Sequence, residues 1–205
     1  MSRRDYYLIL DVAPIAAPAE IQKAYRALSK KYHPDLNPEM KQASNEKMKE
    51  LVEAFNNLND TNKRKLYDKQ PQFQLRKFAK GRKQPDKKAF SSKAEPEKKS
   101  IIARLFAPFF KKGAAGPAGP DPKQADVHFT LGLSMADNES FLEQAKAEFG
   151  SSVKFDATYK EAAYNYALLC YKLGQFDEAR ASLQKYVATT ADDQLAKKFL
   201  SILSD

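Results

Sequence analysis

The sequence predicts an all-α protein with two helical units joined by a basic linker. Apolar residues recur at spacings of three and four in two stretches of the first 70 residues, which is the periodicity of amphipathic helices. The stretch HFTLGLSM, at residues 128–135, resembles AYNYALLC 35 residues later, and such a period is typical of paired-helix repeats. Between these regions, residues 71–124 are rich in Lys and Pro and lack a core-forming pattern. We therefore predict an N-terminal unit at 1–70, a linker at 71–124 and a repeat unit at 125–205.

Composition narrows the class of protein further. The 205 residues carry a net charge of +9, and the linker alone holds 14 Lys and Arg against 4 Asp and Glu. The single cysteine, Cys170, excludes an intrachain disulfide and fits a reducing compartment. The N-terminus lacks the apolar run of a signal peptide, and no stretch reaches the roughly 20 apolar residues of a spanning helix. We expect a soluble, cytoplasmic protein.

The N-terminal unit is predicted to contain two long antiparallel helices and a short third one. The two apolar stripes are formed by Ile21, Ala24, Tyr25, Leu28 and Tyr32, and by Met48, Leu51, Val52, Phe55 and Leu58. Pro18 suits a first helical turn, and Pro34 ends the first helix near Tyr32. Asp60 or Thr61 can cap a short helix that runs through Tyr67. The residues assigned to the core are Tyr6, Tyr7, Leu10, Tyr25, Leu28, Leu51, Phe55 and Tyr67.

The tripeptide His33-Pro34-Asp35, between the two long helices, is the candidate functional site. A metal site is disfavoured because the N-terminal unit contains no second His and no Cys, whereas zinc needs three or four such ligands. Acid–base catalysis is disfavoured because two short helices provide little pocket and no nucleophile or phosphate-binding motif lies nearby. A plain turn and a docking loop remain.

The helix before the tripeptide favours the docking loop. Lys23, Arg26 and Lys30 lie on the face of helix 18–32 opposite its apolar stripe. Positive charge steers an acidic partner, and a proline loop presents its polar groups with little loss of entropy. We therefore expect a binding protein that is not an enzyme and has no catalytic residue, cofactor or metal.

Three segments in order, DYYLILDV, EIQKAYRALSKKYHPDLNP and FNNLNDTNKRKLYD, resemble the J domain of DnaJ-type co-chaperones. The resemblance covers about the first 70 residues. It implies a four-helix fold and a partner, an ATP-loaded DnaK-type heat-shock chaperone whose ATP hydrolysis the domain accelerates. It assigns chaperone binding to the loop residues His33, Pro34 and Asp35 and to the basic residues Lys23, Arg26 and Lys30.

The repeat unit resembles tetratricopeptide repeats. Tyr164–Tyr186 matches one repeat well, with Gly174 at its turn and Ala179 at a close helix contact, and Ala125–Thr158 is a looser copy. Helix Asp193–Leu203 is predicted to cap the array, and packing roles are expected for Cys170 and His128. Such repeats bind peptides or helices in a groove, so we expect them to recruit an unknown client or partner protein. The alternative is that they serve only as a helical support or as a self-association surface.

The linker leaves several interpretations open. Its Lys, Pro and Gly content predicts that the two units move independently. Residues 100–112 form an amphipathic segment bracketed by lysines, which could contact an anionic membrane, a partner groove or the protein itself. An adaptor that binds nucleic acid or an anionic membrane through the basic linker is therefore the alternative function. Nucleic acid is disfavoured because regularly interleaved aromatic residues are missing.

Overall fold

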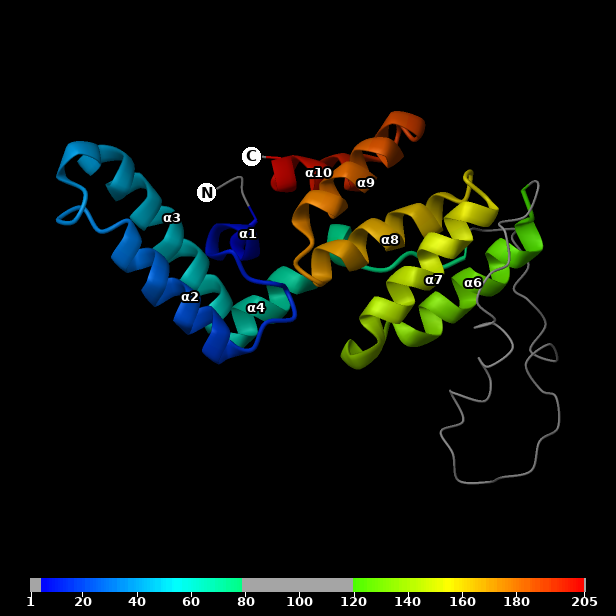
Figure 1. The fold of residues 1–205 in the computed structure, drawn as a ribbon, viewed down its shortest axis with the longest axis horizontal. Coiled ribbons are helices and arrows are strands. Elements are labelled where there is room, and N and C mark those ends of the chain that lie inside the picture. Colours follow the sequence, from blue (N-terminus) through cyan, green and yellow to red (C-terminus); the bar gives the residue numbers. More distant parts are fainter. Residues whose placement is uncertain (1–4, 79–119, 205) are drawn as a thin grey trace, which may run out of the picture.

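The computed structural model describes residues 5–78 and 120–204, and Figure 1 shows its arrangement. The described residues are helical and contain no strand, which confirms the predicted all-α fold class. The predicted segment 100–112 and most of the predicted linker lie outside the described residues. In the part of the chain that is described, no helix has the length and apolar character needed to cross a membrane.

Four helices form the N-terminal unit, residues 5–68: α1 (Tyr6–Leu10), α2 (Pro18–Lys31), α3 (Lys41–Asn59) and α4 (Thr61–Asp68). The helices α2 and α3 lie side by side and antiparallel, as predicted, and project away from the rest of the molecule (Figure 1). The rings of Tyr25 and Phe55 stack between them at 4.2 Å. The apolar stripes of the sequence therefore face one another, and the α2–α3 loop lies at the far tip of the pair.

Local capping explains where these helices begin. Ala17 precedes α2 and has no side-chain acceptor, but its backbone N–H donates to Oε2 of Glu20 at 2.7 Å. Asp60 caps α4 by accepting hydrogen bonds from the backbone N–H groups of Asn62 and Lys63. Side-chain oxygens at such positions satisfy amide groups that have no partner inside the helix. Asp60 was one of the two capping residues predicted from the sequence.

Helices α1 and α4 are held together by polar groups at the other end of the unit. Arg64 of α4 donates to the Tyr7 hydroxyl at 3.0 Å and to the backbone oxygens of Pro14 and Ala16 at 2.8 Å each. The Tyr7 hydroxyl in turn donates to Asp68 at 2.8 Å. One arginine therefore fastens both α1 and the loop before α2 to the last helix of the unit.

The repeat unit, residues 120–204, consists of two helical hairpins and a final helix. Its elements are α6 (Pro122–Met135), η4 (Glu139–Phe141), α7 (Leu142–Phe155), α8 (Lys160–Lys172), α9 (Phe176–Thr189) and α10 (Gln194–Ser204). Gly174 makes the α8–α9 turn at a φ of 78°, a conformation that side chains with a Cβ rarely adopt. Cys170 is fully buried, as predicted, and His128 packs on Phe155 with its ring nitrogen 2.6 Å from Glu148.

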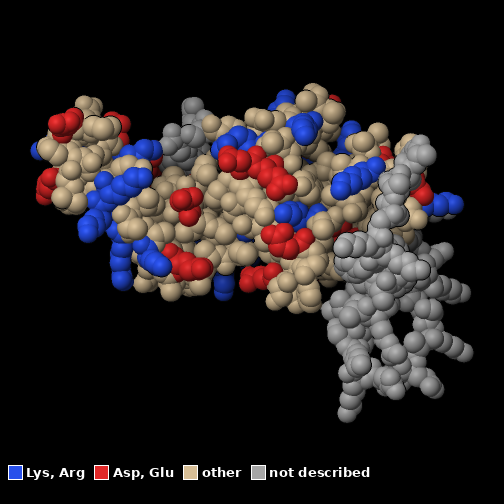
Figure 2. All heavy atoms as spheres, viewed as in Figure 1, with Lys and Arg blue, Asp and Glu red and all other residues tan. Residues whose placement is uncertain are grey.

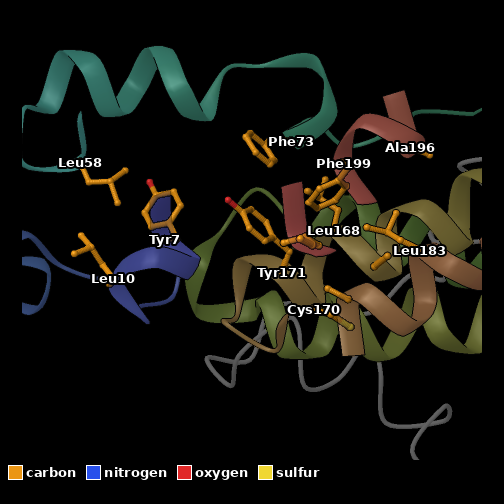
Figure 3. Close-up of a cluster of buried hydrophobic side chains, with 14 of the residues drawn as sticks. Tyr7, Leu10, Leu58, Phe73, Leu168, Cys170, Tyr171, Leu183, Ala196 and Phe199 are labelled. Carbon is orange, nitrogen blue, oxygen red and sulfur yellow. The ribbon is translucent and has the colours of Figure 1, made fainter. Parts of the chain in front are cut away.

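The two units share one hydrophobic core, contrary to the prediction that they move independently. Tyr7 and Leu10 belong to the same buried cluster as Tyr171 and Phe199 of the repeat unit. In Figure 3, Tyr7 lies near Tyr171, and the rings of Tyr171, Phe73 and Phe199 contact one another. The two units therefore form a single packed body.

The connecting segment, residues 71–78, completes this packed body, which corrects the prediction that the linker begins at residue 71. It begins with the short helix η2 (Pro71–Phe73) and continues without regular structure along α8 toward α6 (Figure 1). Phe73 stacks on Tyr171 at 5.1 Å with nearly parallel rings, and Phe78 meets Phe129 edge-on at 4.9 Å. The segment has no helical or strand periodicity, so its apolar residues give no signal in the sequence. Phe73 is buried against Tyr171, nearly a hundred residues away, and Phe78 is half-buried against Phe129.

A buried carboxyl group also joins the two units. Asp5 is fully buried and accepts hydrogen bonds from the hydroxyls of Tyr67 in α4, at 2.6 Å, and Tyr171 in α8, at 2.7 Å. Burial raises the pKa of Asp5 above its ordinary value, although these hydroxyls act in the opposite direction. A buried carboxyl group needs such partners, so the contact between the units depends on this geometry.

Candidate functional site

The candidate site is the loop that joins α2 to α3, and Asn37 holds its shape. The Asn37 side-chain amide donates to the backbone oxygens of Lys31 at 2.9 Å and His33 at 3.0 Å. The backbone N–H of Leu36 donates to the oxygen of His33 at 3.0 Å, which closes a turn. One asparagine therefore ties the loop to the last turn of α2. No role was predicted for Asn37 from the sequence, although an asparagine close to two prolines is typical of turns.

His33 and Asp35 are presented to solvent by this loop. Their side chains are 47% and 84% exposed, and His33 Nδ1 lies 3.7 Å from the Asp35 carboxylate. The Asp35 backbone N–H donates to His33 Nδ1 at 3.2 Å. In the neutral ring this leaves the proton on Nε2, available to donate to a partner. Pro34 between them restricts the backbone, so the geometry of the two polar groups is set before any partner binds.

The basic face of α2, formed by Lys23, Arg26 and Lys30, is exposed and leads to this loop. The three residues follow at spacings of three and four, so they share one face of the helix. Figure 2 shows Lys and Arg side chains gathered on the part of the N-terminal unit that carries α2. The structure therefore places all six predicted site residues on one helix–loop element, with the three basic residues on one exposed face of α2 and the other three in the loop that follows it.

Two exposed apolar side chains of the same α2–α3 connection extend this surface. Leu36 directly follows Asp35, and Met40 ends the short helix η1 (Pro38–Met40); their side chains are 62% and 65% exposed. Large apolar residues with such exposure beside a charged surface are typical of protein interaction sites. The arrangement can thus combine charge, a fixed polar loop and apolar contact.

A cleft of about 570 Å³ separates the α2–α3 pair from the repeat unit. It is lined by Lys31 and Tyr32 next to the loop, by residues of α1 and α3, and by Arg180 and Ser204 of the repeat unit. The loop itself does not line the cleft. The repeat unit therefore flanks the candidate site and leaves the loop residues open to solvent.

Comparisons with known proteins identify both units. Residues 5–68 match the family model of the DnaJ domain, and residues 142–203 match a family model of the tetratricopeptide repeat. The Chaperone protein DnaJ of Staphylococcus aureus strain JH1 is 53% identical over 68 residues, which is 33% of this chain and 17% of that protein. The proteins of the same name in strains Mu3 and USA300 / TCH1516 match to the same extent. No solved structure matches the chain.

These comparisons confirm the resemblances drawn from the sequence. The chain carries a DnaJ domain, called the J domain below, followed by a helical unit similar to tetratricopeptide repeats. The likeness to the DnaJ chaperones is confined to the J domain, because the aligned region spans only 17% of their length. The rest of this chain, including its connecting segment, is outside that likeness.

Proposed function

We propose that this protein is a co-chaperone whose J domain binds an ATP-loaded DnaK-type heat-shock chaperone and stimulates its ATP hydrolysis. The observation that carries the proposal is the exposed His33-Pro34-Asp35 loop, held by Asn37 at the end of the basic helix α2. The 53% identity of this domain to that of proteins named Chaperone protein DnaJ supports the same conclusion.

The geometry suggests a division of roles within the J domain. Lys23, Arg26 and Lys30 lie on an exposed face and would accelerate the encounter with an acidic surface of the chaperone. The loop would then make the specific contact, with His33 as donor and Asp35 as acceptor. Because Pro34 and Asn37 already order the loop, little conformational entropy is lost when it binds.

The repeat unit supplies the second part of the proposed function. Tetratricopeptide repeats support protein–protein interaction, and here they would recruit a client or partner. Since the two units share a core, a protein bound to the repeat unit would be held at a fixed position relative to the loop. The target would thereby be placed where the chaperone is activated.

The test is the ATP turnover of a purified DnaK-type chaperone at increasing concentrations of this protein. We expect His33→Gln and Asp35→Asn each to abolish stimulation and to leave the helical circular dichroism signal unchanged, because both side chains are exposed. The matched control is Asp137→Asn, which removes one exposed carboxylate from the repeat unit and should stimulate like the wild type. Stimulation that survives both loop substitutions would overturn the proposed function.

A further inference from the structure

The backbone of the connecting segment is bound by the repeat unit in the way a peptide ligand is bound. The Arg76 backbone N–H donates to Asn165 Oδ1 at 2.7 Å, and Asn165 Nδ2 donates to the Arg76 backbone oxygen at 2.8 Å. The Tyr164 hydroxyl donates to the backbone oxygen of Gln72 at 2.6 Å. Since the residues after η2 form neither helix nor strand, Asn165 of α8 binds the backbone groups of Arg76 that regular structure would otherwise satisfy.

Within the described residues, the side-chain hydrogen bonds of Asn165 go to the connecting segment and not to the repeat unit. Its side chain is fully buried in α8, and both of its amide atoms bond to the backbone of one residue of the connecting segment. A buried amide whose partners were removed would cost stability, so an asparagine at this position is useful only when an extended backbone lies across it.

The Arg76 side chain enters a site assembled from three elements of the repeat unit. Its guanidinium lies 3.6 Å from the ring centroid of Tyr164 and 5.4 Å from that of Tyr186. Arg76 Nη1 lies 2.5 Å from the Asp193 carboxylate and donates to the Tyr186 hydroxyl at 2.6 Å. Partial burial would raise the pKa of Asp193, but the hydrogen bond from Arg76, with smaller contributions, lowers it to about 2. An arginine held by aromatic faces and a carboxylate is strongly specified.

The two ends of the segment differ in depth. Phe73 is 4% exposed and belongs to the shared core, whereas Leu75, Arg76 and Phe78 are half-buried. The first end is therefore part of the fold, and the second end lies on the surface of the repeat unit. Release of residues 75–78 would expose the arginine site without removing Phe73 from the core.

From this geometry we propose that Tyr164, Asn165, Tyr186 and Asp193 form a binding site for extended, arginine-bearing peptides. Residues 75–78 occupy it from within the same chain. A partner that carries an arginine in an extended segment flanked by aromatic residues enters only by displacing them. The tethered segment competes for the site at an effective concentration on the order of millimolar. Only a ligand that outcompetes it at this concentration can bind.

The first experiment measures binding of a labelled synthetic peptide with the sequence of residues 70–78 to the full chain by fluorescence anisotropy. We expect the chain variant Arg76→Ala/Phe78→Ala to bind this peptide at least tenfold more tightly than the wild-type chain, because its own segment no longer fills the site. A peptide with Arg76→Ala should bind this variant at least tenfold more weakly. The matched control chain, Lys77→Ala, changes an exposed neighbour and should behave like the wild type.

The second experiment uses the wild-type chain, so it does not depend on a variant that folds. Hydrogen exchange of the Arg76 amide, whose acceptor is Asn165, is followed while millimolar peptide is added. We expect exchange to accelerate with the intact peptide and not with the Arg76→Ala peptide. Unchanged exchange, or equal binding of the peptide to the wild-type and folded variant chains, would overturn the proposal. Neither measurement involves a heat-shock chaperone, so the outcome is independent of the proposed function.

Discussion

The tip and the base of the J domain are built in different ways. At the tip, the α2–α3 loop is held by Asn37 and by residues within a few positions of it, and its side chains are exposed. At the base, Asp5 and the residue Phe73 of the adjoining connecting segment contact Tyr171, which lies about a hundred residues or more away in the sequence, and they are buried. The conformation of the tip is thus set by residues close in sequence, and its side chains are exposed to solvent. The base depends on tertiary contacts, and its side chains are buried.

The tip is therefore suited to bind a partner protein, and the base attaches the J domain to the repeat unit. A surface that must engage another protein cannot be buried in its own chain, whereas a base packed into the repeat unit loses the freedom a linker would give. The tip can therefore keep the properties of a J domain while the base determines its orientation. Changes at the base should affect folding and coupling, and changes at the tip should affect partner binding alone.

The largest expected effect is at the base. Phe73→Ala removes a buried ring that packs on Tyr171 and Phe199, and should lower the free energy of unfolding by about 3–5 kcal/mol. In urea, hydrogen exchange in peptides from α3 and α8 should report one shared transition for the wild type and two for the variant. Phe55→Ala is the control, because Phe55 stacks within the α2–α3 pair and its loss should not separate the units. Two transitions in the wild type would contradict the shared core.

The next largest effect is on the rate of association with the chaperone, which depends on the basic face of α2. Reversal of Lys23, Arg26 and Lys30 to Glu should lower the rate of association with the chaperone about tenfold at low salt, since exposed charges act mainly on the encounter. The wild-type rate should fall as salt is added. Stopped-flow measurements give these rates directly. Reversal of three exposed lysines around α4, Lys63, Lys65 and Lys69, serves as the control. If both triple variants slow equally, net charge and not the α2 face is responsible.

A smaller effect on stimulation of the chaperone ATPase is expected when Asn37, which holds the loop, is replaced. Asn37→Ala deletes the two hydrogen bonds to Lys31 and His33, and the loop must then be ordered during binding. A cost of about 1 kcal/mol corresponds to roughly a fivefold higher chaperone concentration for half-maximal ATPase stimulation. The thermal midpoint should hardly change. Asn45→Ala, at an exposed position of α3, is the matched control; a large loss of stability would place Asn37 in the fold and not in the docking loop.

The smallest expected change is in the pH dependence of stability. Burial raises the pKa of Asp5 in the folded protein, so the folded state retains a proton that the unfolded chain releases first. Stability from this group is therefore fully present below the unfolded pKa, near 3.8, and is lost as the pH rises through the folded value. The Asp5→Asn variant has no carboxyl group at this position and does not lose stability in this way. The difference in free energy of unfolding between the wild type and the variant should therefore shrink as the pH rises.

Urea unfolding at several pH values measures this dependence. Asp68, whose pKa is also raised by burial, is present in both proteins and cancels from the comparison. Asp11→Asn removes the same charge from an exposed neighbour and should leave the pH dependence of the wild type unchanged. A wild-type advantage that grows with pH would mean that Asp5 is stabilised as a carboxylate by Tyr67 and Tyr171.

The tip could be predicted from the sequence because its determinants are close together in the chain. The apolar stripes, Pro18 and Pro34 set the helices, and the spacing of Lys23, Arg26 and Lys30 sets the basic face. The helical hairpins of the repeat unit were predictable for the same reason, down to the turn at Gly174. In each case a period of three to four residues, or a short motif, carries the information.

What the sequence by itself determined is therefore the set of helices, the composition of the loop and the identity of the two units. The tertiary structure alone decided that the units share a core, that Asp5 lies between two tyrosines, and that the Arg76 side chain enters a site made by Tyr164, Tyr186 and Asp193. The physical reason is that an irregular segment has no periodicity that marks its buried side. Its contacts exist only when distant residues are brought together by folding.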